Sequence, residues 1–447
     1  MRRLMLTAMA SGSGKTTVTC ALLAAMRGRG IPVQSFKCGP DYIDPMFHTQ
    51  VLGVPSRNLD LFLQGPAGVR RTLARQEANF ALVEGAMGYY DGVGGTSDAS
   101  AWQTADTAGI PAVLVLRPSS SGLTLAAQVR GLQSFRSPSR LAGLILNGCK
   151  SSLHAYLRPL LERETGLPVL GYLPPMEEAV LPSRHLGLLT AGEITDLSAR
   201  IEILAAQMER TVDIPALLAL AEAAPEPAAA PVPAPVRCRI AAARDEAFCF
   251  LYEDNLDALR QSGAEVVFFS PLRDRELPPG IDGLYLAGGY PELHARELSR
   301  NETMRESVRR AVAAELPTVA ECGGFLYLQQ TLEDEAGTPW PMAGALPGAG
   351  FRTEHLQRFG YLTLTAEDGS LLLRRGETVP AHEFHYWDCT ENGAALAAQK
   401  PGRETAWRCG FASPNLYAAF PHLHFNGQLP LARRFADRAA RWREEHP

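Results

Sequence analysis

Residues 4–26, LMLTAMASGSGKTTVTCALLAAM, run from a short apolar segment through a glycine-rich turn into a second, longer apolar segment. Gly12 and Gly14 allow a tight backbone turn, so that several N–H groups can point at one anion. Lys15 would neutralise phosphate charge, and the hydroxyl of Thr16 would bind Mg²⁺. The pattern predicts a strand, a phosphate-binding loop and a helix, the opening of a nucleotide-binding α/β domain.

Two positions near this loop depart from related patterns. The strict phosphate-loop pattern has glycine where this chain has Met9. Partition-type ATPases carry a second lysine five positions before the loop lysine, where this chain has Ala10. The chain therefore lacks the residue that would favour a dimerising switch ATPase. A glycine turn with an incidental lysine is the alternative to a phosphate site.

The N-terminal half alternates short apolar segments with longer amphipathic ones. Short apolar runs are typical of strands covered on both faces, and amphipathic segments between them are typical of helices. The alternation predicts a parallel sheet with covering helices. The expected strands lie at 4–9, 81–86, 111–116, 141–147 and 168–173.

Residues 221–236, AEAAPEPAAAPVPAPV, mark a domain boundary. Their density of Pro and Ala predicts a semi-rigid linker without a regular helix or a ladder strand, and an irregular surface loop would imply the same boundary. We expect one domain at 1–220 and another at 237–447. Strands expected at 238–245, 263–272, 281–289 and 317–322 make the second domain α/β as well.

Length and composition agree with a two-domain enzyme. A chain of 447 residues is too long for one ordinary core. The formal net charge of -5 provides no general attraction to nucleic acid or membranes, and no apolar run reaches the roughly 18 residues needed to span a bilayer. The start, MRR, precedes only a short apolar segment, so no signal peptide is expected. Eight scattered cysteines without CxxC pairs fit reduced thiols in the cytoplasm.

The stretch FKCGPDYIDPMFHT (36–49) follows an apolar segment and is dense in functional side chains. Lys37 and Asp41 are therefore expected near the carboxyl end of a strand, where open α/β sheets bind ligands. Lys37 could offset charge on a transferring phosphoryl group. Alternatively, Asp41 and Asp44 only form turns beside prolines.

The stretch VEGAMGYYDG (83–92) similarly places Glu84 at the end of a predicted strand and Asp91 in the loop beyond it. Carboxylates at this edge can hold Mg²⁺ and orient an acceptor. Both could instead be solvated loop residues. We expect the carboxylates of the two stretches to converge on the phosphate loop.

The stretch PTVAECGGFLYLQQ (317–330) predicts a strand, a cysteine in a glycine turn and a helix. Such a turn exposes the side chain of Cys322 and directs it toward a helix N-terminus, which lowers the pKa of a thiol. Cys322 is therefore a candidate nucleophile, and an inert buried thiol is the alternative.

A thiolate nucleophile also needs a base and donors for a developing oxyanion. Residues 418–427, AAFPHLHFNG, resemble a strand on which His422 and His424 share one face, and they supply the candidate base. The glycine turn LAGGYPE (286–292) ends a predicted strand, and its backbone N–H groups could face the oxyanion.

Short motifs along nearly the whole chain, apart from the linker, resemble the cobyrinate a,c-diamide synthase family of cobalamin biosynthesis. The resemblance implies a dethiobiotin-synthetase-like ATP domain followed by a class I-type (triad) glutamine amidotransferase domain. The motifs are SGSGKTT, FKCGPDYIDPMFHT, SRNLD (56–60), VEGAMGYYDG, LPSRHLGL (181–188), ARDEAFCFLYEDNL (243–256), FSPLRD (269–274), GGYPE, AECGGFLYL and HLHF.

The resemblance implies a reaction that uses both domains. The cysteine attacks the side-chain amide of glutamine and releases ammonia, while MgATP phosphorylates a carboxylate of the corrin. Ammonia then displaces phosphate, and the a and c carboxylates of cobyrinate become amides. The expected small-molecule partners are thus glutamine, ATP and a tetrapyrrole carboxylate. A homodimer is a further possibility that the sequence does not decide.

The resemblance also implies roles for individual residues. The nucleotide would bind to Gly12, Ser13, Gly14, Lys15, Thr16, Thr17 and Asn147, with Asn147 at the adenine. Mg²⁺ would bind to Thr16, Asp41 and Glu84. The catalytic set would be Cys322, His422, His424, Lys37, Asp44 and Asp91, and the substrates would contact Tyr42, Ile43, Gly288 and Gly289.

The chain departs from the family pattern at one catalytic position, and two alternative functions remain. Relatives with a Cys-His-Glu triad carry a glutamate two residues after the histidine, where this chain has His424. The same amidation could act on hydrogenobyrinate or nickel-sirohydrochlorin, because short motifs do not report macrocycle shape. A regulatory phosphate-loop ATPase with an inactive amidotransferase module would be expected to lose Cys322 or the histidine pair, and this chain retains them.

Overall fold

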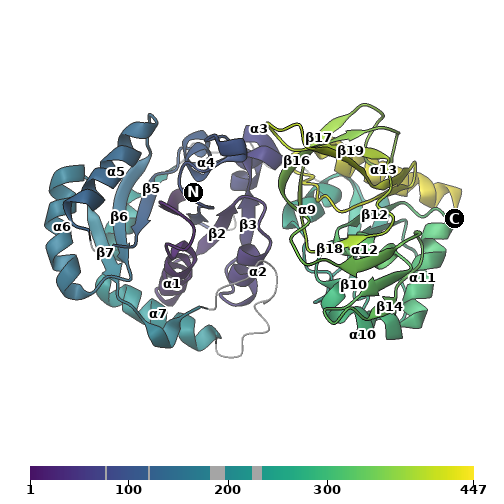
Figure 1. Ribbon diagram of the computed structural model, residues 1–447, viewed down its shortest axis with the longest axis horizontal. Coiled ribbons are helices and arrows are strands. Elements are labelled where there is room, and N and C mark those ends of the chain that lie inside the picture. Colours follow the sequence, from purple (N-terminus) through teal and green to yellow (C-terminus); the bar gives the residue numbers. More distant parts are fainter. Residues whose placement is uncertain (76–77, 119–120, 182–196, 224–233, 447) are drawn as a thin grey trace. The chain divides into compact units, whose positions relative to one another are not determined.

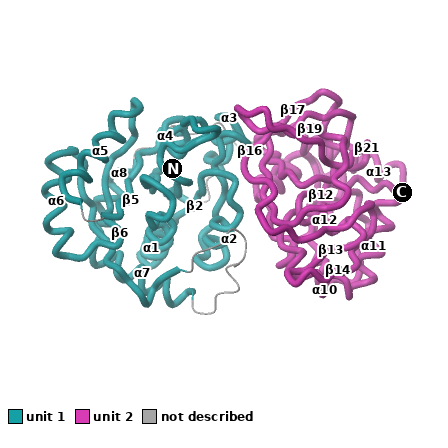
Figure 2. The backbone as a smooth tube through the Cα atoms, viewed as in Figure 1, with its two compact units in different colours: residues 1–230 teal, residues 231–447 magenta. Residues whose placement is uncertain are grey.

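A computed structural model describes residues 1–75, 78–118, 121–181, 197–223 and 234–446 (Figure 1). The chain divides into two compact units, unit 1 at 1–230 and unit 2 at 231–447 (Figure 2). Most of the motif at 181–188 and of the linker expected at 221–236 lies outside the described residues. The linker was expected to form no strand, but its residues Glu222–Ala223 pair antiparallel with the first strand of the chain.

Unit 1 is built on a parallel sheet, as its apolar segments predict. The strand order is β3-β2-β4-β1-β5-β6-β7, and β8 is a short antiparallel addition to β1. The strands are β1 (Arg2–Ala8), β2 (Val33–Cys38), β3 (Ser56–Leu59), β4 (Phe80–Glu84), β5 (Ala112–Leu116), β6 (Leu141–Asn147), β7 (Val169–Leu173) and β8 (Glu222–Ala223).

Helices cover both faces of this sheet. Leu4 and Leu6 of β1 share a core with α1, α2, α7 and α8, whereas Met5 packs into a second core with α3 to α6. Side chains that alternate between two buried layers explain why β1 is apolar at successive positions. The helices are α1 (Lys15–Gly28), α2 (Ile43–Gln50), α3 (Leu61–Ala74), α4 (Ala101–Ala108), α5 (Leu123–Phe135), α6 (Ser151–Thr165), α7 (Leu197–Thr211) and α8 (Ile214–Leu220), with short 3-10 turns η1 (Val93–Gly95) and η2 (Glu177–Ala179).

Unit 2 contains a second mainly parallel sheet, with strand order β10-β9-β11-β12-β22-β21 and only β21 antiparallel. Its strands are β9 (Cys238–Ala243), β10 (Ala264–Phe269), β11 (Gly283–Leu286), β12 (Thr318–Glu321), β21 (Phe411–Ser413) and β22 (Leu416–Ala419). The helical segments are α9 (Glu253–Gln261), η4 (Pro291–His294), α10 (Ala295–Arg300), α11 (Glu302–Ala313), α12 (Gly323–Leu328) and α13 (Leu429–Glu445). The two-domain α/β fold is thus confirmed.

Two four-stranded sheets add to unit 2 and were not expected from the sequence. One has the order β14-β13-β15-β18 and the other, fully antiparallel, has the order β17-β16-β19-β20. Their strands are β13 (Thr331–Glu333), β14 (Pro339–Pro341), β15 (Ala349–Arg352), β16 (Arg358–Ala366), β17 (Thr378–His385), β18 (Trp387–Cys389), β19 (Leu396–Gln399) and β20 (Ala406–Cys409). The second sheet extends the core of unit 2 through Leu362, Leu364 and Ala381.

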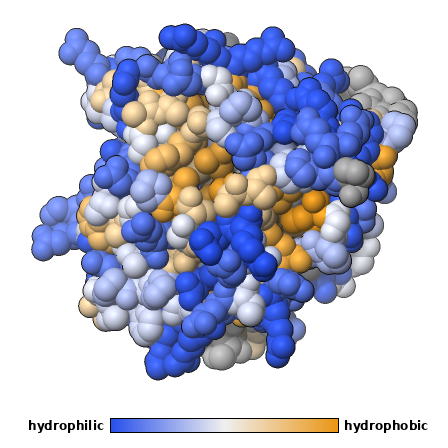
Figure 3. Space-filling view, turned by 90° about the vertical axis from the view of Figure 1, so that its right-hand side faces the viewer, coloured by the Kyte–Doolittle hydropathy of each residue, from blue (hydrophilic) through white to orange (hydrophobic). Residues whose placement is uncertain are grey.

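The surface of unit 2 carries both apolar and hydrophilic side chains. Figure 3 shows apolar side chains gathered across the middle of one face, with hydrophilic side chains around them. Among the residues that the structure describes, no helix is both long and apolar enough to cross a membrane.

Candidate active site

In unit 1 the phosphate loop joins the end of β1 to the start of α1. Gly14, the residue before the helix, has φ +88°, a conformation that glycine adopts without strain. A side chain there would also collide with Asn147, because an added Cβ would lie 2.0 Å from its Nδ2 atom. The Asn147 amide donates a hydrogen bond to the Ser13 carbonyl at 3.0 Å. The structure thus brings the expected loop residues and Asn147 together.

Lys15 lies over the loop rather than in solvent. Its ammonium donates hydrogen bonds to the carbonyl oxygens of Ala10, at 3.2 Å, and of Met87. Burial, reinforced by the positive charge of Lys37, lowers the pKa of Lys15 to about 8. An anion at the loop would favour the charged form of this lysine, because an opposite charge nearby offsets the cost of burial.

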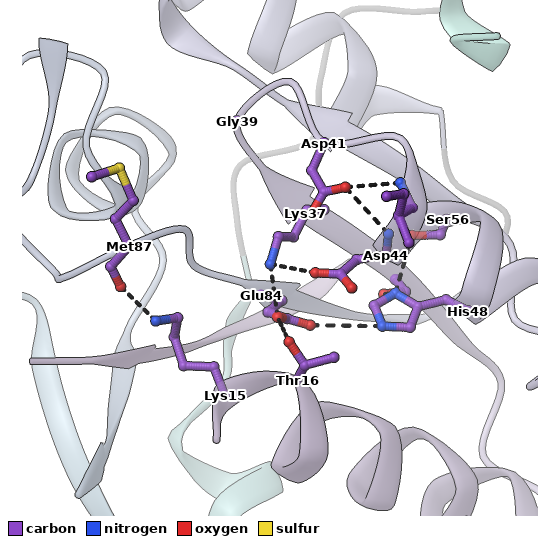
Figure 4. A network of polar contacts seen from close by, with 12 residues as sticks. Lys15, Thr16, Lys37, Gly39, Asp41, Asp44, His48, Ser56, Glu84 and Met87 are labelled. Carbon is purple, nitrogen blue, oxygen red and sulfur yellow. Dashed lines mark hydrogen bonds and ion pairs between the residues drawn. The ribbon is translucent and has the colours of Figure 1, made fainter. Parts of the chain in front are cut away.

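Lys37 and Glu84 form the centre of a buried ionic cluster (Figure 4). The Lys37 ammonium lies 2.7 Å from Asp44 Oδ2 and 2.7 Å from Glu84 Oε1. Glu84 Oε1 also accepts a hydrogen bond from the Thr16 hydroxyl at 2.6 Å. Burial lowers the pKa of Lys37, but the charges of Asp44 and Glu84 together outweigh burial and raise this pKa well above its usual value. The cluster therefore links the first turn of α1 to the ends of β2 and β4.

Asp41 lies in the loop between β2 and α2. Its Oδ1 atom accepts hydrogen bonds from the backbone N–H groups of Ile43, at 2.8 Å, and of Asp44, at 3.4 Å, in the first turn of α2. Burial, followed by the negative charge of Asp44, raises the pKa of Asp41 to about 7. Tyr42 and Ile43, the expected substrate contacts, are partly exposed at this end of α2.

Asp91 differs from the other carboxylates because it is exposed. Its Oδ2 atom accepts a hydrogen bond from the Gly88 N–H at 3.0 Å, and its charge favours the protonated form of Lys15. Asp91 is thus close enough to influence the loop lysine electrostatically. Thr17 is partly exposed in the first turn of α1.

His48 belongs to this cluster but was not assigned from the sequence. It is fully buried, and its Nε2 atom lies 3.7 Å from Glu84 Oε2. Its Nδ1 atom lies 2.9 Å from the Ser35 hydroxyl and 3.4 Å from that of Ser56. The available signal was its spacing of four residues from Asp44, which places both on one face of a helix.

The donor set of this cluster fits Mg²⁺ in company with a nucleotide. Mg²⁺ usually binds to one or two carboxylates, with substrate phosphates and water completing its shell. The Thr16 hydroxyl, which donates to Glu84, keeps an oxygen lone pair for such an ion, and Glu84 is the carboxylate beside it. No group of three or more His, Cys, Asp or Glu side chains that could hold a metal occurs among the described residues.

In unit 2 the predicted strand, turn and helix around the cysteine are present. β12 ends at Glu321 and α12 begins at Gly323, with Cys322 between them at φ 48°, a strained value for a side-chain-bearing residue. Gly324 has to be glycine, because an added Cβ would lie 2.2 Å from the Leu286 carbonyl oxygen. The geometry is that of a nucleophile turn.

The environment of the thiol corrects two expectations. We expected a lowered pKa, but burial raises the pKa of Cys322 strongly, and the charges of Glu292 and Glu383 add to the effect. The Gly323 N–H offsets only part of it. The turn was also expected to expose the Cys322 side chain, but Cys322 is only 5% exposed, and its Sγ atom lies 4.0 Å from the Phe384 carbonyl oxygen. The thiol is therefore protonated in this state.

His422 lies beside the expected oxyanion turn. An added Cβ at Gly288 would lie 2.5 Å from His422 Cε1, so glycine leaves the room that the imidazole occupies. An added Cβ at Gly323 would lie 3.0 Å from the Gly289 nitrogen, so the turn also contacts the residue after the nucleophile. The Cys322 N–H donates to the Ala419 carbonyl at 2.9 Å, three residues before His422. The nucleophile turn, the glycine turn and His422 are therefore neighbours.

The histidine pair is not on a regular strand, which corrects a further expectation. β22 ends at Ala419, and His422 then forms a single antiparallel bridge with His382, with backbone hydrogen bonds of 2.8 and 3.1 Å. His424 is buried, its ring lies 4.7 Å from that of Tyr252, and burial lowers its pKa to about 3. Pro421 interrupts the ladder because proline has no N–H to donate.

Glu321 is a second residue that sequence reasoning missed. It is fully buried, and its Oε2 atom lies 3.9 Å from His422 Nδ1. A separate pair occupies β17, where Glu383 Oε1 lies 2.8 Å from His385 Nε2. Glu321 precedes the cysteine directly, but a lone glutamate at a strand end carries no signal of its partner.

Comparison with family models assigns each unit. Residues 4–188 match the CobQ/CobB/MinD/ParA nucleotide binding domain, and residues 239–430 match the CobB/CobQ-like glutamine amidotransferase domain. The first range contains the phosphate loop and the ionic cluster around Lys37. The second contains Cys322 and His422. Unit 1 is thus a nucleotide-binding domain and unit 2 a glutamine amidotransferase domain.

Several curated relatives match along almost the full length. The chain is 37% identical to the cobyrinate a,c-diamide synthase of Clostridium tetani over 442 residues, which cover 98% of this chain and 100% of the relative. It is 41% identical to that of Salmonella typhimurium over 430 residues, 93% of each chain. It is 40% identical to that of a Synechococcus species over 436 residues, 95% of each chain. Taken with the two domain matches, these relationships show that the chain belongs to the cobyrinate a,c-diamide synthase family.

Proposed function

We propose that the chain uses ATP and glutamine to convert the a and c carboxylates of cobyrinate into amides. The observation that carries the proposal is the association of Cys322, the Gly288 turn and His422 in the amidotransferase domain. A regulatory ATPase would not need a strained nucleophile turn next to an imidazole. The substrate follows from the relatives, which are named for cobyrinate.

Ammonia release begins with proton transfer from the Cys322 thiol to His422. The sulfur then bonds to the side-chain carbonyl carbon of glutamine, and the backbone of the Gly288–Gly289 turn faces the oxyanion. His422 returns its proton to the departing nitrogen, which leaves as ammonia. Water then hydrolyses the glutamyl thioester and regenerates the thiol. Because the resting thiol is protonated, the base is needed at every turnover.

Carboxylate activation belongs to unit 1. The phosphate loop and Lys15 would hold the phosphates of ATP, and Mg²⁺ bound near Thr16, Asp41 and Glu84 would offset their charge. Asp44 and Asp91 would position the acceptor carboxylate, which attacks the terminal phosphorus of ATP, so that an acyl phosphate forms and ADP leaves. Ammonia attacks the acyl carbon and phosphate leaves. Activation replaces a poor leaving group with a good one.

The experiment that tests the proposal identifies the product. Purified protein with MgATP and glutamine is offered cobyrinate, hydrogenobyrinate or nickel-sirohydrochlorin, and products are analysed by mass spectrometry. We expect cobyrinate to gain two amide groups, with ATP and glutamine consumed. Amidation of only one of the other macrocycles would change the assigned substrate. Absence of glutamine hydrolysis in every mixture would contradict the proposal.

A further inference from the structure

We infer that Glu321 is the positioning carboxylate of His422 and takes the place of the triad glutamate that His424 replaces. This inference rests on the proposed function, since it assigns a partner within the same glutamine site. Glu321 is the last residue of β12 and Cys322 follows it directly. One strand end would therefore supply both the nucleophile and the group that orients its base.

The topology of the sheet brings the two residues together. β12 pairs in parallel with β22, with Glu321 opposite Ala419. The chain leaves β22 at Ala419 and reaches His422 three residues later, at the same edge of the sheet. Glu321 Oε2 consequently lies 3.9 Å from His422 Nδ1, within ion-pair distance once the imidazole is protonated.

Two donors hold the Glu321 carboxylate independently of His422. The Tyr285 hydroxyl donates to Oε2 at 3.1 Å, and the Leu423 N–H donates to Oε1 at 3.0 Å. Asn255 Nδ2 donates to the Tyr285 oxygen at 3.2 Å. Burial and the charge of Glu321 raise the pKa of Tyr285 well above its usual value, so its hydroxyl stays protonated and keeps donating. Both carboxylate oxygens are thereby fixed before the imidazole acquires a charge.

The Glu321 carboxylate would stabilise the positive charge that develops on His422 when the thiol loses its proton. When the thiol proton moves to His422, an imidazolium forms in a buried site, where an uncompensated charge is costly. The Glu321 charge would stabilise the imidazolium and hold the ring with Nε2 directed away from the carboxylate. Glu321 keeps its own charge throughout, and the proton passes only between sulfur, imidazole and the leaving nitrogen.

His424 does not supply the same function. With a pKa lowered to about 3 by burial, His424 is neutral at physiological pH and carries no negative charge. Its ring packs with Tyr252 at 4.7 Å. Glu383, another buried carboxylate near the thiol, hydrogen bonds to His385 at 2.8 Å. Glu321 is thus the carboxylate that the structure places beside His422.

The test uses three variants of the full chain: Glu321→Gln, Glu321→Asp and Asn255→Ala. Glu321→Gln keeps the shape of the side chain and removes its charge, and it can accept only one of the two hydrogen bonds because an amide nitrogen does not accept. We expect its kcat for glutamine hydrolysis to fall about 10- to 100-fold, while KM for glutamine changes less than about threefold. Glu321→Asp should recover part of kcat, because it restores the charge at a longer distance. Amidation with ammonium salts should be unchanged.

Asn255→Ala removes the hydrogen bond to the Tyr285 hydroxyl and loosens the histidine segment, but it leaves the Glu321 charge in place. Asn255 donates to the Leu423 carbonyl at 2.9 Å and accepts from the Phe425 N–H at 2.7 Å, so its loss loosens the same segment without removing a charge. We expect lower thermal stability with a smaller decrease of kcat than in Glu321→Gln. Wild-type kcat in Glu321→Gln, or an equal loss of kcat in Asn255→Ala and Glu321→Gln at matched stability, would overturn the inference. A wild-type protein without glutaminase activity would instead contradict the proposed function, and this inference with it.

Discussion

The two candidate sites handle charge in opposite ways. In unit 1, Lys37 lies 2.7 Å from both Asp44 and Glu84, so the ionic cluster is built from the protein's own charged side chains. In unit 2, the Cys322 thiol is neutral, and Glu321 lies 3.9 Å from the His422 imidazole that would accept the thiol proton during the reaction. Phosphoryl transfer depends on preorganised charge, because the protein does little covalent chemistry in it. Thiol chemistry needs charge only during the reaction, and a neutral resting thiol is protected from side reactions.

The largest expected effects come from removing one reactive group at a time. We expect Cys322→Ala to lose more than about 10³-fold of glutamine hydrolysis and of glutamine-dependent amidation, whereas saturating ammonium restores amidation.

Lys15→Ala should abolish amide formation from either nitrogen source and leave some glutamine hydrolysis. Both activities are measured as ammonia release and as amide product. Loss of both activities in Lys15→Ala would contradict the division of labour.

Lys37→Met tests whether the ionic cluster is preformed. It leaves two buried carboxylates without their shared cation, so we expect unit 1 to lose about 3–5 kcal/mol of unfolding free energy, together with amidation activity. Chemical denaturation provides the measurement. In the double variant Lys37→Met/Glu84→Gln, part of the stability should return while activity does not. Unchanged stability in Lys37→Met would show that the cluster is not charged as described.

Asp44→Asn and Asp91→Asn compare a buried and an exposed carboxylate of one site. Both variants should lower amidation about tenfold or more and change the ATP dissociation constant by less than about threefold, if the residues position the acceptor. Only Asp44→Asn should lower the melting temperature, because Asp44 is 7% exposed and paired with Lys37. A large rise in the ATP dissociation constant would reassign either residue to nucleotide binding.

The smallest effect concerns pH. Since the pKa of Lys15 is lowered to about 8, its positive charge is lost as the pH rises through that value. We expect ATP affinity to fall about three- to tenfold between pH 7 and pH 9 at constant free Mg²⁺, as measured by calorimetry. Lys15→Ala should bind more weakly at every pH and show a flat profile. An equally steep profile in that variant would assign the titration to another group.

Local sequence patterns predicted those parts of the molecule that are encoded within a few adjacent residues. The loop around Lys15 and the turn around Cys322 each consist of a strand, glycines and a helix start within one short stretch, and both are present. The placement of Glu84 at a strand end also followed from a local apolar run. Such features depend on backbone geometry that neighbouring residues determine.

Features that depend on contacts between distant parts of the sequence were either not predicted or predicted wrongly. Glu321 meets Leu423 across 102 residues of sequence, so its function depends on the pairing of β12 with β22. The pKa of Cys322 was expected to be lowered because a helix start is visible in the sequence. The burial and the nearby carboxylates that raise it come from other segments.

The close contact of Gly288 with His422 suggests a way to separate glutamine hydrolysis from amidation in one enzyme. An alanine at this position would displace the His422 ring, because its methyl carbon would lie 2.5 Å from an atom of that ring. The substitution adds one carbon to unit 2 and leaves the sequence of unit 1 unchanged. It would therefore convert the protein into a synthetase that depends on free ammonium, with its nucleophile still in place but without a correctly seated base.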